Sequence, residues 1–146
     1  MDDSRVRRVH GYIALETEVR PSPIDKLGLF AKRDIPRGTV VAAWGGRILT
    51  RTEIDGLPAR FRTNYSLPIY PGFYLAEAKA EDLDASDFIN HSCDPNCHIV
   101  NFLIMLAKRR IKAGEELTAD FDCGRKSGVR SACHCGSGKC RRFVYF

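Results

Sequence analysis

Short apolar runs separated by glycine and proline dominate the pattern of this chain. The clearest run covers residues 39–44 (TVVAAW), which is partly β-branched and lies between Gly38 and the pair Gly45-Gly46. A short apolar run between turn residues is typical of a buried strand. The same criteria predict strands at residues 29–31, 65–70, 73–75, 99–107 and 117–121, with a Pro71-Gly72 turn before residue 73.

One segment, residues 50–61, has the start of a helix. Thr50 can cap a helix N-terminus, and Glu53 three residues later completes the pattern of a capping box. Gly56 and Pro58 would keep this helix short. Residues 35–38 and 111–116 have the composition of turns. Many short strands with little helix predict a mostly β fold.

Size and composition place the chain among ordinary globular domains. It has 146 residues, of which 44% are hydrophobic and 28% are charged, which suits a single domain with its own core. No apolar run approaches the roughly 18 residues that span a bilayer, and the first residues lack the apolar stretch of a secretory signal. We therefore expect an intracellular protein without a membrane partner, in the cytoplasm or in the nucleus or nucleoid.

Charge is unevenly distributed along the chain, whose net charge is +5. Six acids and one base lie between Glu77 and Asp94, whereas six bases and no acid lie between Arg125 and Arg142. Both stretches could be solvated faces. Alternatively, the acidic stretch attracts a basic protein or peptide, and the basic stretch makes a weak contact with nucleic acid. Monomer and dimer are both compatible with this distribution.

The cysteines are confined to the last third or so of the chain: Cys93, Cys97, Cys123, Cys133, Cys135 and Cys140. The last three form a C-x-C-x₄-C pattern, which offers three thiolates to a metal. A tetrahedral zinc site needs a fourth ligand, and Cys93 could supply it. The remaining two would be small buried groups. Three disulfides are the competing interpretation, which a reducing compartment disfavours.

Five motifs in order resemble those of the SET-domain protein-lysine methyltransferases, over about 120 residues from Gly28 to Val144. The most specific covers residues 88–97 (FINHSCDPNC), which is close to the signature of the family. The others are residues 27–31, residues 35–38 with 40–46, residues 111–121, and a terminal segment from Cys133 to Arg141 that resembles a post-SET zinc segment.

The resemblance implies a SET-domain fold of small β-sheets, with a knot-like C-terminal crossing. It implies an N-terminal extension or edge strand in residues 1–20, a SET domain in 21–124 and a zinc-bound post-SET segment in 125–146. It also implies a protein-lysine N-methyltransferase. Such an enzyme binds S-adenosylmethionine on one side of a narrow channel and a lysine of a basic protein, such as a histone-like tail, on the other.

Motif positions assign roles to individual residues. Asn90 and His91 would contact the cofactor. The other cofactor-binding positions are Lys26, Leu27, Gly28, Leu29, Tyr65 and Phe143. The family fills the fourth zinc position with the signature cysteine, here Cys93, so that four thiolates form a closed structural site.

Several positions depart from the family pattern. The family commonly has a tyrosine where this chain has Phe121, a Phe or Tyr where it has Ala119, and another channel tyrosine where it has Trp44. Asp87 and Lys26 stand in place of the usual arginine and glycine. The resulting catalytic positions are Phe121, Ala119, Trp44 and Tyr65.

The missing hydroxyl at Phe121 leaves an alternative open. Loss of one positioned polar group at a reacting centre can slow a reaction by about 10²–10³. The alternative is a catalytically weak or inactive SET module that binds cofactor, peptide or a protein partner. A hydroxyl could also come from another strand, through Tyr65, Tyr70, Tyr74 or Tyr145. The small Ala119 would widen the channel and suit a methylated lysine.

Overall fold

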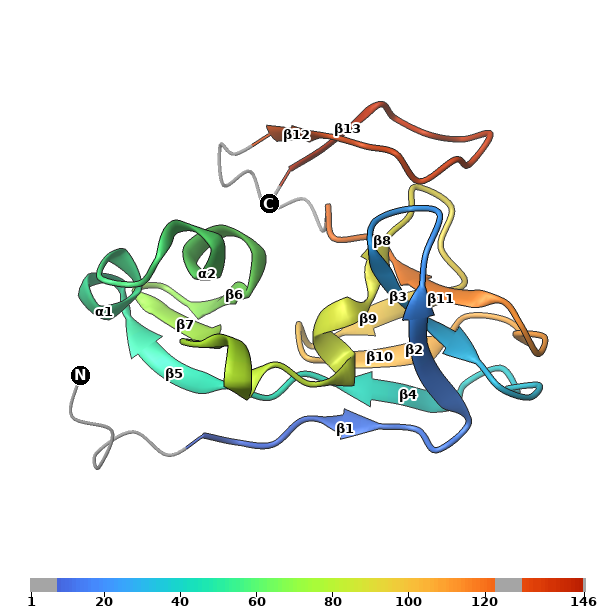
Figure 1. Ribbon diagram of the computed structural model, residues 1–146, viewed down its shortest axis with the longest axis horizontal. Helices are drawn as coiled ribbons and strands as arrows, with labels where there is room; N and C mark the ends of the chain where they lie inside the picture. Colours follow the sequence, from blue (N-terminus) through green and yellow to red (C-terminus); the bar gives the residue numbers. More distant parts are fainter. Residues whose placement is uncertain (1–7, 123–129, 146) are drawn as a thin grey trace.

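A computed structural model describes residues 8–122 and 130–145 of the chain (Figure 1). The helical elements are α1 (Arg51–Asp55), α2 (Ala59–Asn64), and the 3₁₀ turns η1 (Ala80–Asp82) and η2 (Ala85–Phe88). The strands are β1 (Tyr12–Ile13), β2 (Thr17–Pro21), β3 (Leu27–Ala31), β4 (Val40–Ala43), β5 (Arg47–Thr50), β6 (Ser66–Tyr70), β7 (Phe73–Ala76), β8 (Asn90–His91), β9 (Cys97–Val100), β10 (Ile104–Ala107), β11 (Glu116–Ala119), β12 (Arg130–Ala132) and β13 (Phe143–Tyr145). The predicted mostly β fold of small sheets is confirmed.

Two four-stranded sheets share the main core. One has the order β1-β4-β10-β9 and the other the order β2-β3-β11-β8, in which β8 runs parallel to β11. Apolar side chains from both sheets form one buried cluster, which includes Leu29, Val41, Met105 and Leu117, all of them 0% exposed. This packing fixes β11, and therefore β8 beside it, on a rigid base.

The third sheet, β5-β7-β6, carries both α-helices and lies on the left in Figure 1. Its own smaller core contains Leu49, Ile54 and Phe61. The predicted capping box is confirmed, because the Thr50 side chain accepts the backbone N–H of Glu53 while Glu53 caps the Thr50 backbone. Helix α1 ends at Asp55. No helix among residues 8–122 and 130–145 is long and apolar enough to cross a membrane.

The prediction of a single strand over residues 99–107 is wrong. These residues belong to two antiparallel strands, β9 and β10, joined by a tight turn. Three residues, Asn101 to Leu103, connect the strands, and Asn101 and Phe102 both have positive φ, 48° and 66°, as the central positions of a type I′ turn require. Phenylalanine rarely adopts this backbone conformation, so the pattern of apolar residues does not predict a turn here.

The chain leaves β11 at Ala119, so Asp120 and Phe121 follow the strand rather than end it. The antiparallel pair β12–β13 forms a separate two-stranded sheet, at the top of Figure 1. Phe121 contacts His91 of β8, and the cysteines between β12 and β13 lie beside Cys93, just after β8. The knot-like C-terminal crossing stays a prediction.

Candidate functional site

The Asn90-His91 pair forms strand β8, at the edge of its sheet. Asn90 pairs with Thr118 and His91 with Ala119, and the Ser92 N–H donates to the Ala119 carbonyl at 3.0 Å. As an edge strand, β8 has one side of its backbone outside the hydrogen-bonded ladder. That side can offer backbone groups to a ligand.

A buried asparagine holds the signature motif in place. Asn96 is 6% exposed, donates from Nδ2 to the Glu116 carbonyl at 2.8 Å and accepts the Thr118 N–H on Oδ1 at 3.0 Å. It therefore bridges two backbone groups of β11. The loop after β8 cannot move without breaking these bonds, which favours a preorganised site.

The Asn90 side chain connects β8 to the turn at residues 22–26. Its Nδ2 donates to the Leu27 carbonyl at 2.9 Å and to Glu116 Oε1 at 2.8 Å. The Ser22 hydroxyl donates to the same Glu116 carboxylate at 2.8 Å. The structure thus brings the residues 26–29 motif beside Asn90. Glu116 was not predicted as a site residue, because its partners lie 94 and 26 positions away in sequence.

Lys26 in this turn and Gly28 in the following strand, β3, have tightly constrained backbones. A Cβ at Gly28 would lie 2.2 Å from Glu116 Oε1, so glycine here makes room for the carboxylate. Lys26 has φ 31°, in the left-handed region that favours glycine. Where the family has glycine, this chain therefore has a lysine under backbone strain.

Replacing Lys26 with glycine is expected to raise the free energy of unfolding by about 0.5–1 kcal/mol, because the Cβ clash at positive φ disappears. Urea denaturation measures the change. Lys26→Ala is the matched control, since it removes the ammonium group and keeps the Cβ. Equal stabilisation by both substitutions would show that charge, not backbone strain, was relieved.

The His91 ring is fully engaged within the protein. Its Nδ1 accepts the Phe121 N–H at 3.2 Å, and its Nε2 lies 3.3 Å from Cys93 Sγ. Burial lowers the pKa of His91, although Asp120 opposes this effect, so the ring is neutral near pH 7. With Nδ1 accepting, the proton resides on Nε2 and is donated to Cys93. Any hydrogen bond of His91 to a cofactor would therefore use its backbone.

Phe121 and Trp44 form an aromatic pair next to this ring. Their ring centroids are 6.0 Å apart, and the Phe121 and His91 centroids are 6.4 Å apart. Trp44 donates its indole N–H to the Ser86 carbonyl at 3.0 Å. Ala119 is 0% exposed in the main core, against which Trp44 and Phe121 pack. Three of the four predicted catalytic positions therefore share one neighbourhood, and it is apolar.

The other aromatic candidates lie on different elements. Tyr65 packs on Phe61 in the core of the third sheet, with ring centroids 5.6 Å apart. Phe143 is 41% exposed on β13, where the Arg130 guanidinium lies 4.1 Å above its ring. Of the further tyrosines, Tyr70 and Tyr145 are exposed, and Tyr74 accepts a hydrogen bond from Arg51.

Four cysteines come together at the start of the C-terminal segment. The sulfurs of Cys93, Cys133, Cys135 and Cys140 all lie within 4.8 Å of one another. Four convergent thiolates are the donor set of a closed tetrahedral zinc site, so the residues fit this metal.

All five described cysteines are free. Cys97 is buried in the main core, which raises the pKa of its thiol to about 12, and Cys123 lies outside the described residues.

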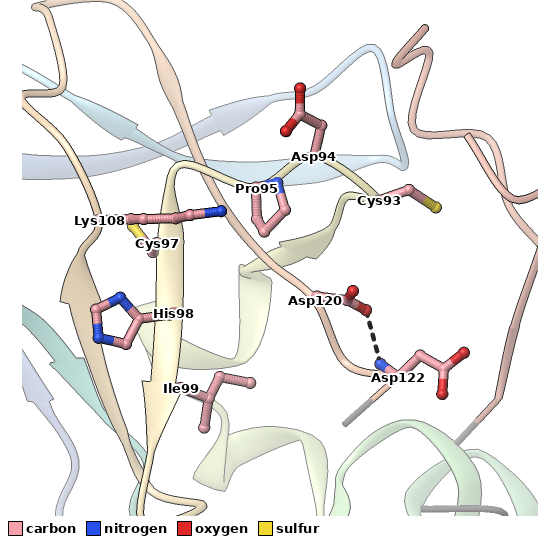
Figure 2. Close-up of a pocket in the computed structure, with 9 residues that line it drawn as sticks. All are labelled: Cys93, Asp94, Pro95, Cys97, His98, Ile99, Lys108, Asp120 and Asp122. Atoms are coloured by element: carbon pink, nitrogen blue, oxygen red, sulfur yellow. Dashed lines mark hydrogen bonds between the residues drawn. The ribbon is translucent and has the colours of Figure 1, made fainter. Parts of the chain in front are cut away.

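A polar pocket of about 400 Å³ lies beside Cys93 (Figure 2). Its lining residues are Cys93, Asp94, Pro95, Cys97, His98, Ile99, Lys108, Asp120 and Asp122. Asp120 also lies 3.6 Å from the His91 ring, measured from Oδ1 to Nδ1. This carboxylate therefore stands between the pocket and the strand that carries the signature.

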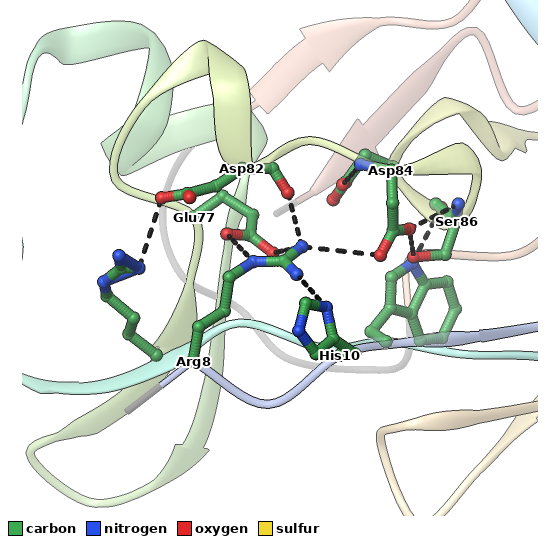
Figure 3. Close-up of polar contacts among 9 residues, drawn as sticks. Arg8, His10, Glu77, Asp82, Asp84 and Ser86 are labelled. Atoms are coloured by element: carbon green, nitrogen blue, oxygen red, sulfur yellow. Dashed lines mark hydrogen bonds and ion pairs between the residues drawn. The ribbon is translucent and has the colours of Figure 1, made fainter. Parts of the chain in front are cut away.

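The acidic stretch that starts at Glu77 is largely paired within the chain (Figure 3). Arg8 donates to Glu77 at 2.8 Å and lies 3.4 Å from Asp84. Arg47 donates to Asp82 at 3.2 Å. These contacts attach the segment before β1 to the end of the third sheet.

In the basic stretch, Arg125 and Lys126 lie outside the described residues, and Arg130, Lys139 and Arg141 each contact an aromatic ring or an acid.

Asp87 belongs to the same region and is partly buried. Its carboxylate accepts the Asp84 N–H at 2.8 Å and caps the 3₁₀ turn η2. Burial raises the pKa of Asp87 to about 7, with the charges of Asp84 and Glu77 adding to the effect. The folded protein therefore holds this proton more tightly than the unfolded chain, whose aspartate has a pKa of 3.8.

Stability linked to Asp87 is expected to be fully present below pH 4 and to decrease as the pH rises through about 7. Asp87→Asn keeps an oxygen that can accept the Asp84 N–H but cannot ionise. The variant should exceed the wild type by about 1–3 kcal/mol in unfolding free energy at pH 8, and the difference should vanish or reverse at pH 4. Urea unfolding at both pH values measures it, with Asp25→Asn in an exposed loop as control. A constant difference would contradict the linkage.

Comparison with known proteins matches the sequence of this chain to one family. A family model described as SET domain matches residues 26–122. The histone-lysine N-methyltransferase trr of Drosophila melanogaster is 36% identical over 136 residues, 84% of this chain. Human histone-lysine N-methyltransferase 2B is 33% identical over 135 residues, also 84% of this chain. A Mycosarcoma maydis histone-lysine N-methyltransferase described as H3 lysine-36 specific is 28% identical over 93% of the chain. The chain spans only 6%, 5% and 15% of these relatives.

Proposed function

Since this chain belongs to the SET-domain family, we propose that it is a protein-lysine methyltransferase that uses S-adenosylmethionine. The observation that carries the proposal is the position of edge strand β8, between the residues 22–27 turn and the Phe121–Trp44 pair. Backbone groups and apolar aromatic side chains meet there. This combination suits a ligand with a polar amino-acid part and a substrate with a long methylene chain.

The proposed cofactor site uses the outer edge of β8 and the backbone of residues 26–29. Asn90 holds the two segments together through its side-chain amide. When bound, S-adenosylmethionine supplies an electrophilic methyl group on a sulfonium. The protein's task is to align that methyl with an incoming amine at near-attack distance, and rigid strands suit this task better than loops.

The proposed lysine channel is lined by Phe121, Trp44 and Ala119. A lysine amine has a free pKa of about 10.4 and must lose its proton before it can attack. Apolar aromatic walls disfavour the charged form and so assist deprotonation. They also contact the methylene stem. The small Ala119 leaves room beside the amine for methyl groups already transferred.

We assign a structural zinc ion to the cluster of four cysteines, which leaves no ligand position for chemistry. On this assignment residues 21–124 form the SET domain and residues 125–146 the zinc-bound post-SET segment. Because several relatives are named histone-lysine N-methyltransferases, we propose a basic, histone-like tail as the substrate class.

Tritiated S-adenosylmethionine and a panel of basic proteins, in zinc-replete buffer, test the activity. We expect label on lysines of at least one histone-like protein and none on the same protein with its lysines chemically blocked. No transfer to any lysine would overturn the proposal. Labelling that persists after blocking would assign the methyl group to another residue type.

A further inference from the structure

Arg141 contacts both the cysteine cluster and the end of β11. Its backbone N–H donates to Cys93 Sγ at 3.4 Å. Its guanidinium makes two parallel hydrogen bonds to the Asp120 carboxylate, each 2.7 Å long. The paired, charge-assisted geometry is stronger and more directional than a single ion pair. Arg141, which follows Cys140, is thus fixed to Asp120, which follows strand β11.

Asp120 passes this connection on to strand β8. The link is the peptide after Asp120: the Phe121 N–H donates to His91 Nδ1 at 3.2 Å, whereas the Asp120 carboxylate, with Oδ1 3.6 Å from that acceptor nitrogen, makes no hydrogen bond to the neutral ring. His91 Nε2 in turn lies 3.3 Å from Cys93 Sγ. The contacts therefore form a closed ring from Cys93 through Arg141, Asp120, the Phe121 N–H and His91 back to Cys93. Every member lies next to the cysteine cluster or to the edge of β8.

Within residues 130–145, the other bases lack this double attachment. Lys139 makes one ion pair with Asp94 at 3.2 Å, and its side chain is 73% exposed. Arg142 contributes backbone groups, with its N–H donating to Cys140 Sγ and its carbonyl accepting the Cys133 N–H. Arg141 is 42% exposed and Asp120 29% exposed, so their pair is partly shielded from solvent.

We propose that Arg141 is a positioning residue that couples metal binding at the four cysteines to cofactor binding at β8. The inference rests on the proposed function, because it assumes a cofactor at that strand. Closing the cysteine cluster on a metal places the Arg141 backbone, and its guanidinium then holds Asp120, Phe121 and the His91 ring in one arrangement. Zinc and cofactor should therefore bind cooperatively, and the coupling should depend on the Arg141–Asp120 pair.

Calorimetric titration of the full chain with S-adenosylhomocysteine tests this coupling, with zinc bound and after chelation. For the wild type we expect the dissociation constant for S-adenosylhomocysteine to be at least tenfold higher without zinc. Arg141→Met should keep one zinc ion per chain. In the zinc-loaded state it should bind S-adenosylhomocysteine at least fivefold more weakly than the wild type does. Chelation should then weaken its affinity by less than a further twofold. Arg141→Lys should resemble Arg141→Met, because a lysine cannot form the paired contact.

Arg142→Met is the matched control, since it removes the same charge from the neighbouring position, and it should behave as the wild type. If Arg141→Met loses zinc, Asp120→Asn replaces it as the test, because this substitution breaks the same pair and leaves the sequence of the C-terminal segment unaltered. Asp120→Asn should show the affinities expected above for Arg141→Met. A zinc-loaded Arg141→Met or Asp120→Asn protein with the wild-type affinity and the wild-type chelation factor would overturn the inference. A wild type that does not bind S-adenosylhomocysteine would instead contradict the proposed function.

Discussion

Replacing Phe121 with tyrosine is expected to increase the rate of methyl transfer at least tenfold, and by up to about 10³-fold, because one positioned hydroxyl at a reacting centre contributes on this scale. The backbone at this position is already fixed, since the Phe121 N–H is bound to His91 Nδ1. Its ring packs between Trp44 and His91. Tyrosine preserves this packing and adds only the hydroxyl that the family usually has.

Single-turnover labelling with a fixed basic substrate measures the effect, so that product release does not mask the chemical step. Phe73→Tyr is the matched control, because it adds the same hydroxyl to a 43% exposed ring on β7. A gain confined to Phe121→Tyr would identify the wild type as an enzyme weakened by one missing group. Equal rates for all three proteins would mean that another group already performs the role of this hydroxyl.

Local chemistry explains which parts of the fold could be predicted. The Thr50 capping box and the strands around residues 29–31, 40–43 and 66–76 depend on residues only a few positions apart. The hairpin at Asn101 and Phe102 was missed, because an apolar residue occupies a left-handed turn position. Local preference is a weak guide wherever the surrounding sheet imposes the backbone conformation.

Long-range polar contacts could not be predicted in this way. The bonds of Glu116 to Ser22 and of Arg8 to Glu77 join residues 94 and 69 positions apart, and neither pair has a spacing rule. Three clustered thiolates leave one ligand position of a tetrahedral metal site open, and the resemblance to the SET family identified Cys93 as the residue that fills it, which its proximity to Cys133 supports. The number of ligands that a metal needs can therefore predict a contact between residues that are far apart in sequence.

Replacing Cys135 with serine is expected to abolish stoichiometric zinc binding, with the zinc dissociation constant rising at least 10³-fold. Structural zinc sites release on the order of 10–16 kcal/mol on binding, and this energy depends on a complete set of ligands. A colorimetric chelator assay on the purified chain measures the zinc content. Cys97→Ala is the matched control, because this cysteine lies in the main core and its variant should keep one zinc ion per chain.

The same variant should leave the main core folded while the C-terminal segment loses its fixed conformation. None of the four clustered cysteines belongs to the buried cluster around Leu29 and Leu117, so the core does not depend on the metal for its packing. Limited proteolysis of Cys135→Ser, or of the chelated wild type, should therefore cut first within residues 130–145. The fluorescence of Trp44 should still unfold cooperatively in urea. Simultaneous loss of both signals on chelation would show that the cysteine cluster and the core fold as one unit.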